Sequence, residues 1–164
     1  MTNAELLILK ANILASPDLD ALKGTPDGRF EIARLYNLPA SPTWVIWRRS
    51  VSRREILQNG FDWTRLDNLS VGKARVWTDI FVDGVINPAK ANVRAGIEAV
   101  WVGTQADVAV RDVIYGHCRA NATRVQKLFS TGTGTAISPA TPSDSGSSDL
   151  TVSLFDVESA LNLA

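Results

Sequence analysis

Apolar residues recur at helical spacing through most of the first 130 residues. Between Gly72 and Trp101 this pattern predicts two helices joined by a tight polar turn. Asp83-Gly84 ends the first helix, because glycine adopts the left-handed conformation at little steric cost. Asn87-Pro88 begins the second, since asparagine is a favoured N-cap and proline is tolerated at the first helical position. This hairpin is predicted to be a scaffold, because it carries no set of side chains arranged for chemistry.

Cap residues, among them Thr2, Ser52 and Thr104, and chain breaks predict further helices on either side of the hairpin. These helices cover residues 3–15, 26–36, 53–58, 104–119 and 123–129, with a short turn at 62–66. Thr43 to Trp47 is compatible with a strand or a buried helical turn. Ser41-Pro42 resembles a cap and first helical position, and no partner strand is nearby, so a helix is favoured. The predicted fold class is mainly α, a small helical bundle.

The composition changes at Thr131, where a low-complexity stretch rich in Ser, Thr, Gly and Pro begins and continues to Asp149. Such a segment buries too little apolar surface to offset its ordering entropy, so we expect it to be extended or flexible. The prediction is therefore a helical body, residues 1–130, and a C-terminal arm, residues 131–164, that ends in a short strand or turn. The alternation at Leu150, Val152 and Leu154 predicts the strand, and residues 157–163 a terminal helical turn.

An apolar end beyond a long polar segment suggests docking on this body or on another subunit, and a frayed terminus is the alternative. The candidate partner-binding residues of the arm are Leu150, Val152, Leu154, Phe155 and Val157.

Charge is unevenly distributed although the net charge is zero. Four acidic residues and no basic residue follow position 130. The first 130 residues therefore carry 17 bases and 13 acids, a net charge of +4. The densest basic cluster consists of Arg48, Arg49, Arg53 and Arg54. It could contact DNA phosphates. The favoured alternative is a solvated face or salt bridges to a neighbouring subunit.

The sequence provides little for catalysis, and we expect no enzyme, metal or cofactor. His117-Cys118 is the only place where a base and a nucleophile adjoin, but neighbours on a helix point about 100° apart and cannot pair. The chain has no second histidine or cysteine, so a packed or capping role is predicted for His117. Thr131 to Gly134, TGTG, lacks the Lys-Ser/Thr of a phosphate loop and is interpreted as a hinge.

Location follows from the same patterns. No apolar run approaches the roughly 18 residues of a transmembrane helix, and the N-terminus lacks the basic region of a secretory signal. A single cysteine fits a reducing compartment or a particle assembled in one. We therefore expect no membrane contact.

Three strings resemble small virion proteins of long-tailed phages and prophages: NGFDWTRLDNLSVGKARVW, NPAKANVRAGIEAVW and DVAVRDVIYGHCRANATRVQKLFSTGTGT. The resemblance spans about Trp44 to Thr135 and is closest to head completion, or head–tail connector, proteins. It implies a helical adaptor that forms a ring beneath the portal, twelve-fold if it matches the portal, with the arm reaching the portal or a neighbouring subunit. Further implied partners are an adjacent neck or tail protein and, non-specifically, the passing DNA. The implied location is the virion neck, after assembly in the host cytoplasm.

Two hypotheses of different classes follow. The first is a non-enzymatic connector (adaptor) that joins capsid to tail; terminator, stopper or other tail-assembly roles are close variants of it. The second is a helical DNA-binding regulator that uses the arginine cluster, Arg48 to Arg54.

Overall fold

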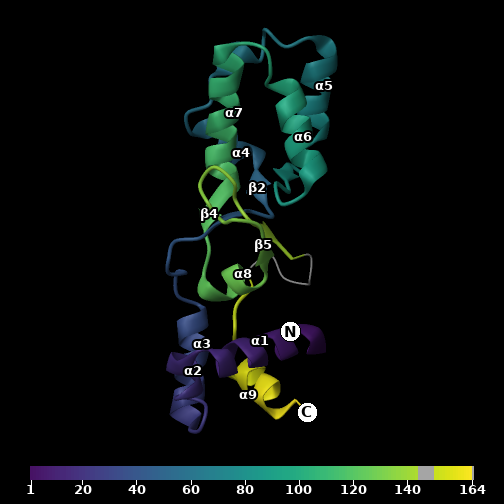
Figure 1. Ribbon diagram of the computed structural model, residues 1–164. Coiled ribbons are helices and arrows are strands. Elements are labelled where there is room, and N and C mark those ends of the chain that lie inside the picture. Colours follow the sequence, from purple (N-terminus) through teal and green to yellow (C-terminus); the bar gives the residue numbers. More distant parts are fainter. Residues whose placement is uncertain (144–149, 164) are drawn as a thin grey trace. The chain divides into compact units, whose positions relative to one another are not determined.

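The computed structural model describes residues 1–143 and 150–163, and the fold is mainly α-helical (Figure 1). These residues form two compact units. Unit 1 contains residues 1–44, 121–131, 143 and 150–163, and unit 2 contains residues 45–120 and 132–142. This division differs from the predicted body and arm, because each unit combines segments that are far apart in the sequence.

Unit 1 is a group of helices around one apolar core. Its elements are α1 (Asn3–Ala15), α2 (Pro17–Asp20), α3 (Pro26–Tyr36), α8 (Arg124–Leu128), β5 (Ser130–Thr131) and α9 (Leu154–Asn162). α9 packs against both α1 and α3. Val157 and Ala160 of α9 are fully buried in the same core as Leu9 and Ile32. The C-terminal helix is therefore an integral part of this core.

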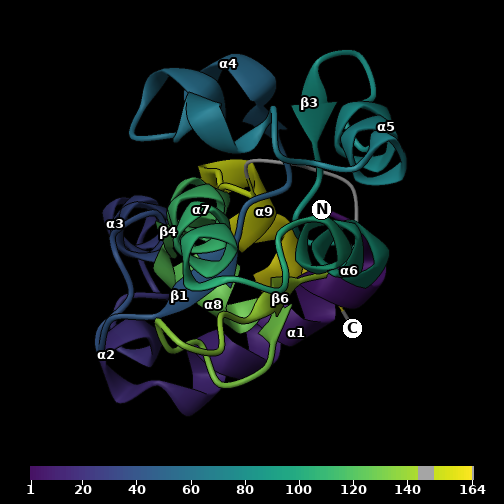
Figure 2. The same cartoon turned by 90° about the horizontal axis from the view of Figure 1, so that it is seen from above.

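Unit 2 holds the predicted hairpin region together with five short strands and a second core; the last residue of one of these strands, Asn121, belongs to unit 1. Its elements are β1 (Val45–Trp47), β2 (Val51–Ser52), α4 (Arg53–Gln58), the 3₁₀ helix η1 (Trp63–Arg65), α5 (Val71–Asp79), β3 (Val85–Ile86), α6 (Ala91–Val100), α7 (Gln105–Cys118), β4 (Arg119–Asn121) and β6 (Thr141–Pro142). α5, α6 and α7 are seen nearly end on in Figure 2, so their axes run in similar directions. The centre of the core is aromatic: the Trp77 and Trp101 ring centroids are 5.4 Å apart, and Phe61 stacks on Trp77 at 6.0 Å.

Local cap signals predicted helix starts well. Thr2 and Glu5 form the expected capping box, and Thr104 forms another with Asp107 at the start of α7. Asp107 also accepts a hydrogen bond from Arg65 over 2.6 Å. This bond, with those from Thr104, lowers the pKa of the Asp107 carboxyl to about 2. The carboxylate therefore stays charged at the positive end of the helix.

The helix favoured for Thr43 to Trp47 is wrong, because this segment contains β1. β1 pairs with β4. On its other side, the Trp47 amide donates to the Ala140 carbonyl over 2.9 Å, and the Ala140 amide donates to the Val45 carbonyl over 2.8 Å. These partners lie more than 70 residues away in sequence, so the sequence around β1 did not predict the pairing.

The turn of the predicted hairpin also differs. Asp83 and Gly84 both have positive φ, 53° and 76°, and form the tip of a tight turn closed by a bridge between Val82 and Val85. They do not end α5, which stops at Asp79. β3 then pairs with β2, and α6 begins at Ala91 after the Lys90 cap, later than the predicted Asn87-Pro88. The pairing with β2 holds this stretch extended, which delays the helix.

The predicted arm is divided between the two units. Ala140, in the low-complexity segment, is fully buried in unit 2. Glycine is favoured at position 132, because its φ is 121° and a Cβ there would lie 3.2 Å from the Ala140 Cα. Residues 144–149 of the segment lie outside the described residues. The strand predicted at residues 150–154 does not form, whereas most of the helical turn predicted at residues 157–163 lies within the longer helix α9.

The aromatic centre of unit 2 yields the first prediction. Replacing the fully buried Trp101 with Ala is expected to lower the free energy of unfolding by about 3–5 kcal/mol, because it removes a large side chain and leaves a cavity. Trp63→Ala is the control: this side chain is 55% exposed, and its loss should have an effect of less than about 1 kcal/mol. Urea unfolding followed by circular dichroism measures both. Equal losses would contradict the assignment of Trp101 to the core.

Candidate interaction site

α1 has a second apolar side, which is exposed. Its buried side supplies Leu6, Leu9 and Ile13 to the core of unit 1. The opposite side, here called the outer face of α1, consists of Ala4, Leu7, Ile8, Ala11, Leu14 and Ala15, all exposed. At about 100° per residue these positions form a stripe about 120° wide. Leu7, Ile8 and Leu14 are 49%, 46% and 46% exposed. Sequence reasoning missed this surface, although apolar residues on two opposite sides of one helix are its signal.

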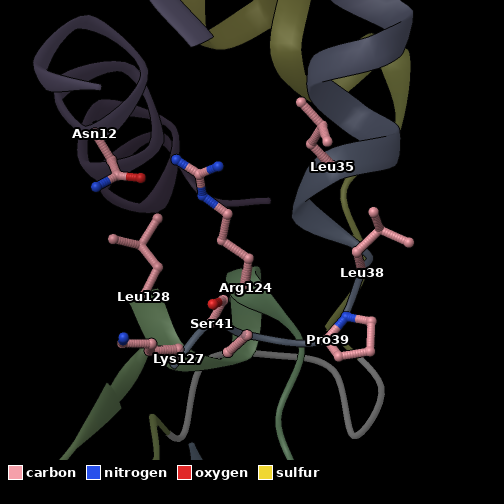
Figure 3. A pocket seen from close by; sticks show the side chains of 9 residues that line it. Asn12, Leu35, Leu38, Pro39, Ser41, Arg124, Lys127 and Leu128 are labelled. Atoms are coloured by element: carbon pink, nitrogen blue, oxygen red, sulfur yellow. The ribbon is translucent and has the colours of Figure 1, made fainter. Parts of the chain in front are cut away.

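Unit 1 also contains a pocket of about 640 Å³ between α1, α3 and α8, here called the unit 1 pocket (Figure 3). Its lining residues are Asn12, Leu35, Leu38, Pro39, Ala40, Ser41, Arg124, Lys127 and Leu128. They come from three separate parts of the chain, which is why the sequence pattern did not predict the pocket. The walls are mainly apolar, two lining residues are cations, and no lining residue is acidic. This chemistry suits an apolar group that carries a negative charge.

The two cations of the pocket are held differently. Arg124 extends between α1 and α3 in Figure 3, where it donates to Asp18 over 3.0 Å and lies 5.4 Å from the centre of the Tyr36 ring. The hydrogen bond from Arg124 lowers the pKa of the Asp18 carboxyl. The Lys127 ammonium lies 5.0 Å from the centre of the Trp44 ring, and no carboxylate among the described residues pairs with it. Lys127 is therefore the cation of the pocket that is better placed to bind a negatively charged group.

Tyr36 is buried in the core of unit 1 and contacts Asn12, one of the residues that line the pocket. Its hydroxyl donates to the Asn12 side-chain oxygen over 2.7 Å. Burial raises the pKa of Tyr36 to about 12, so the hydroxyl stays protonated at physiological pH. The bond fixes Asn12 at the pocket wall.

The five predicted arm residues have different environments. Val152 and Val157 are buried in the core of unit 1, and Leu150 is half-buried. Leu154 is partly exposed, whereas Phe155 is 76% exposed. Phe155 lies on the side of α9 opposite Val157, and Glu158, three residues further on, lies beside Phe155; we call the surface formed by these two residues the outer face of α9. Phe155 is thus the member of the set best placed to contact another molecule.

The arginine cluster is largely occupied by contacts within unit 2. Arg48 pairs with Glu55 and donates to the His117 carbonyl over 2.9 Å. Arg53 lies 5.7 Å from the centre of the Phe81 ring, and Arg54 donates to Gln58 over 3.0 Å. Arg49 is half-buried, and Arg54 is the most exposed of the four. The cluster therefore does not present four equivalent cations to a ligand.

His117 and Cys118 do not form a catalytic pair. The His117 Nε2 lies within hydrogen-bond distance of the Asn59 carbonyl, 2.9 Å, and the Cys118 thiol is fully buried. Burial raises the pKa of Cys118 to about 12, so the thiolate is scarce at physiological pH. Nowhere in residues 1–143 and 150–163 do three or more His, Cys, Asp or Glu side chains gather to hold a metal ion.

Comparison of the chain with protein families, with curated proteins and with solved structures finds no match. None of the helices in the described part of the chain has the length and apolar content needed to cross a bilayer.

The environment of Cys118 yields the second prediction. The native protein should not react with Ellman's reagent at pH 8 within minutes, because the thiol is buried and protonated. In urea the single thiol should react fully. An Ile137→Cys variant is the control, since Ile137 is almost fully exposed and a thiol there should react in the native state. Rapid reaction of the native wild-type protein would contradict the buried position.

Proposed function

We propose that this protein is a structural head-to-tail connector (adaptor) of a tailed phage, which forms a ring beneath the portal and joins capsid to tail. The outer face of α1 is the observation that carries the proposal. Folded proteins rarely leave a continuous apolar surface in water, and such surfaces commonly mark protein interfaces. A chain that works as one part of a larger particle has a physical reason to keep this face exposed.

The portal protein is the proposed occupant of the outer face of α1. The six residues of this face carry no charge, so their partner must offer an apolar surface, as in the packing of one helix into a groove. Complete burial of one Leu or Ile side chain stabilises a contact by roughly 1.5–3 kcal/mol. Leu7, Ile8 and Leu14 can each contribute about half of that, because they are already half-buried. Repetition around a ring multiplies this modest contribution.

The phage assignment itself rests on the resemblance of the strings between Trp44 and Thr135 to connector proteins. The proposal includes no catalytic step and no cofactor. Contact of the C-terminal segment with the portal or a neighbouring subunit, and non-specific contact with DNA, belong to the same proposal. A terminator, a stopper or another tail-assembly protein would use the same surfaces.

The outer face of α1 yields the third prediction. Leu7→Glu/Leu14→Glu should abolish co-purification with the portal protein of the same phage, because two carboxylates would be buried in an apolar contact. Glutamate is a good helix former, and both sites are exposed, so α1 should stay folded. Val71→Glu/Val102→Glu is the matched control, with the same charge change at exposed sites of unit 2.

Size-exclusion chromatography with light scattering, for the protein alone and mixed with the portal, measures these outcomes. The wild type and the control should elute with the portal, and the α1 variant should elute separately. A variant that still binds the portal would overturn the role of the outer face of α1. A wild-type protein that binds neither the portal nor other neck proteins would overturn the connector function.

A further inference from the structure

We infer that the unit 1 pocket is the binding site for the outer face of α9 from a second copy of this chain. In this contact Phe155 enters the apolar part of the pocket, and Glu158 lies near Lys127. The inference rests on the proposed assembly into a ring and specifies which surfaces of adjacent subunits meet.

The outer face of α9 has the chemistry that the pocket requires. Phe155 is the most exposed aromatic side chain among the described residues, and an aromatic side chain is a common anchor of protein interfaces. Glu158 follows it on the same face, with its side chain 40% exposed and 3.9 Å from Arg29. At that distance and exposure the ion pair with Arg29 is weak, and the carboxylate can face a second cation.

The pocket supplies the complementary groups. Leu35, Leu38 and Leu128 provide apolar contact surface, and the volume of about 640 Å³ is ample for one aromatic ring. Lys127 offers a positive charge that no carboxylate of the described residues neutralises. Asp18 already holds Arg124, so the guanidinium is a fixed wall of the site. An acidic aromatic segment therefore fits better than a basic or wholly apolar one.

The occupant must come from another copy. Val157 and Ala160 are fully buried in the core of unit 1, which fixes α9 with Phe155 pointing away from that core. Figure 1 shows α8, which forms one wall of the pocket, and α9 on opposite sides of α1. The chain's own Phe155 cannot reach its own pocket while α9 is packed in this way.

Complementary surfaces on opposite sides of one unit produce a head-to-tail contact. Each copy uses its pocket toward one neighbour and its α9 toward the other, so the contact repeats from copy to copy. Such an arrangement yields a closed ring or a filament, whereas a two-fold dimer would use the same patch on both chains.

Sedimentation velocity of the full chain over a range of concentrations, alone and with the portal, tests this contact. Phe155→Ala should weaken self-association by about tenfold or more, as expected for an aromatic anchor. Phe30→Ala is the matched control, because Phe30 is 62% exposed on α3 and lies outside the pocket, and it should leave association unchanged. Circular dichroism checks that each variant is folded.

A charge exchange identifies the partner directly. Lys127→Glu and Glu158→Lys should each assemble poorly alone, because like charges would meet at every contact. An equimolar mixture should assemble again, since each contact between unlike variants then pairs a lysine with a glutamate. A lesion that only destabilised unit 1 would not be repaired by mixing two different chains.

The outcomes separate the two proposals. If the wild type assembles and Phe155→Ala behaves like Phe30→Ala, or if the mixture of charge variants stays dissociated, the α9–pocket contact is overturned and the connector function stands. If the wild type is monomeric both alone and with the portal and neck proteins, both proposals are overturned.

Discussion

Burial of α9 against α1 and α3 is the contact on which unit 1 depends. α1 is apolar on two opposite sides, so its packing partners decide which of the two is buried and which is exposed. Val157 and Ala160 cover the side that carries Leu9 and Ile13, and the outer face of α1 remains in water. The same packing turns Phe155 away from the core. One intramolecular contact thus determines two of the surfaces available to other molecules.

Features determined by neighbouring residues could be predicted from the sequence, and features determined by distant pairing could not. The caps Thr2, Ser52 and Thr104 were predicted at the correct residues, because a cap satisfies backbone donors within one helical turn. β1 was missed because Ala140, far away in the chain, provides its hydrogen bonds. Asp83-Gly84 was recognised as a chain reversal but assigned to a helix end, since positive φ serves both structures.

The candidate site shows the same limit. Phe155 was named among partner-binding residues because of its apolar, C-terminal position, yet Val152 and Val157 from the same set belong to the core. Periodicity alone could not distinguish them, since burial depends on where α1 and α3 lie. The unit 1 pocket was missed entirely, because Leu35, Lys127 and their neighbours meet only in the folded chain. For the arginine cluster, the sequence indicated a dense positive charge. In the structure Arg48 pairs with Glu55 and Arg53 lies over the Phe81 ring, so these two side chains are already engaged within unit 2.

A head-to-tail contact does not by itself set the number of copies. Its rotation per subunit closes a ring only at certain values, and any other value continues as a filament. In the proposed connector, the outer face of α1 supplies the missing constraint, because a portal bound there fixes each copy at one angular position. The two surfaces then have separate tasks: the apolar face determines where a copy sits, and the Phe155–pocket contact links it to the next. The difference in charge between the two surfaces also prevents the wrong contact. If α9 of a neighbouring copy bound the uncharged outer face of α1, its Glu158 carboxylate would be buried without a partner.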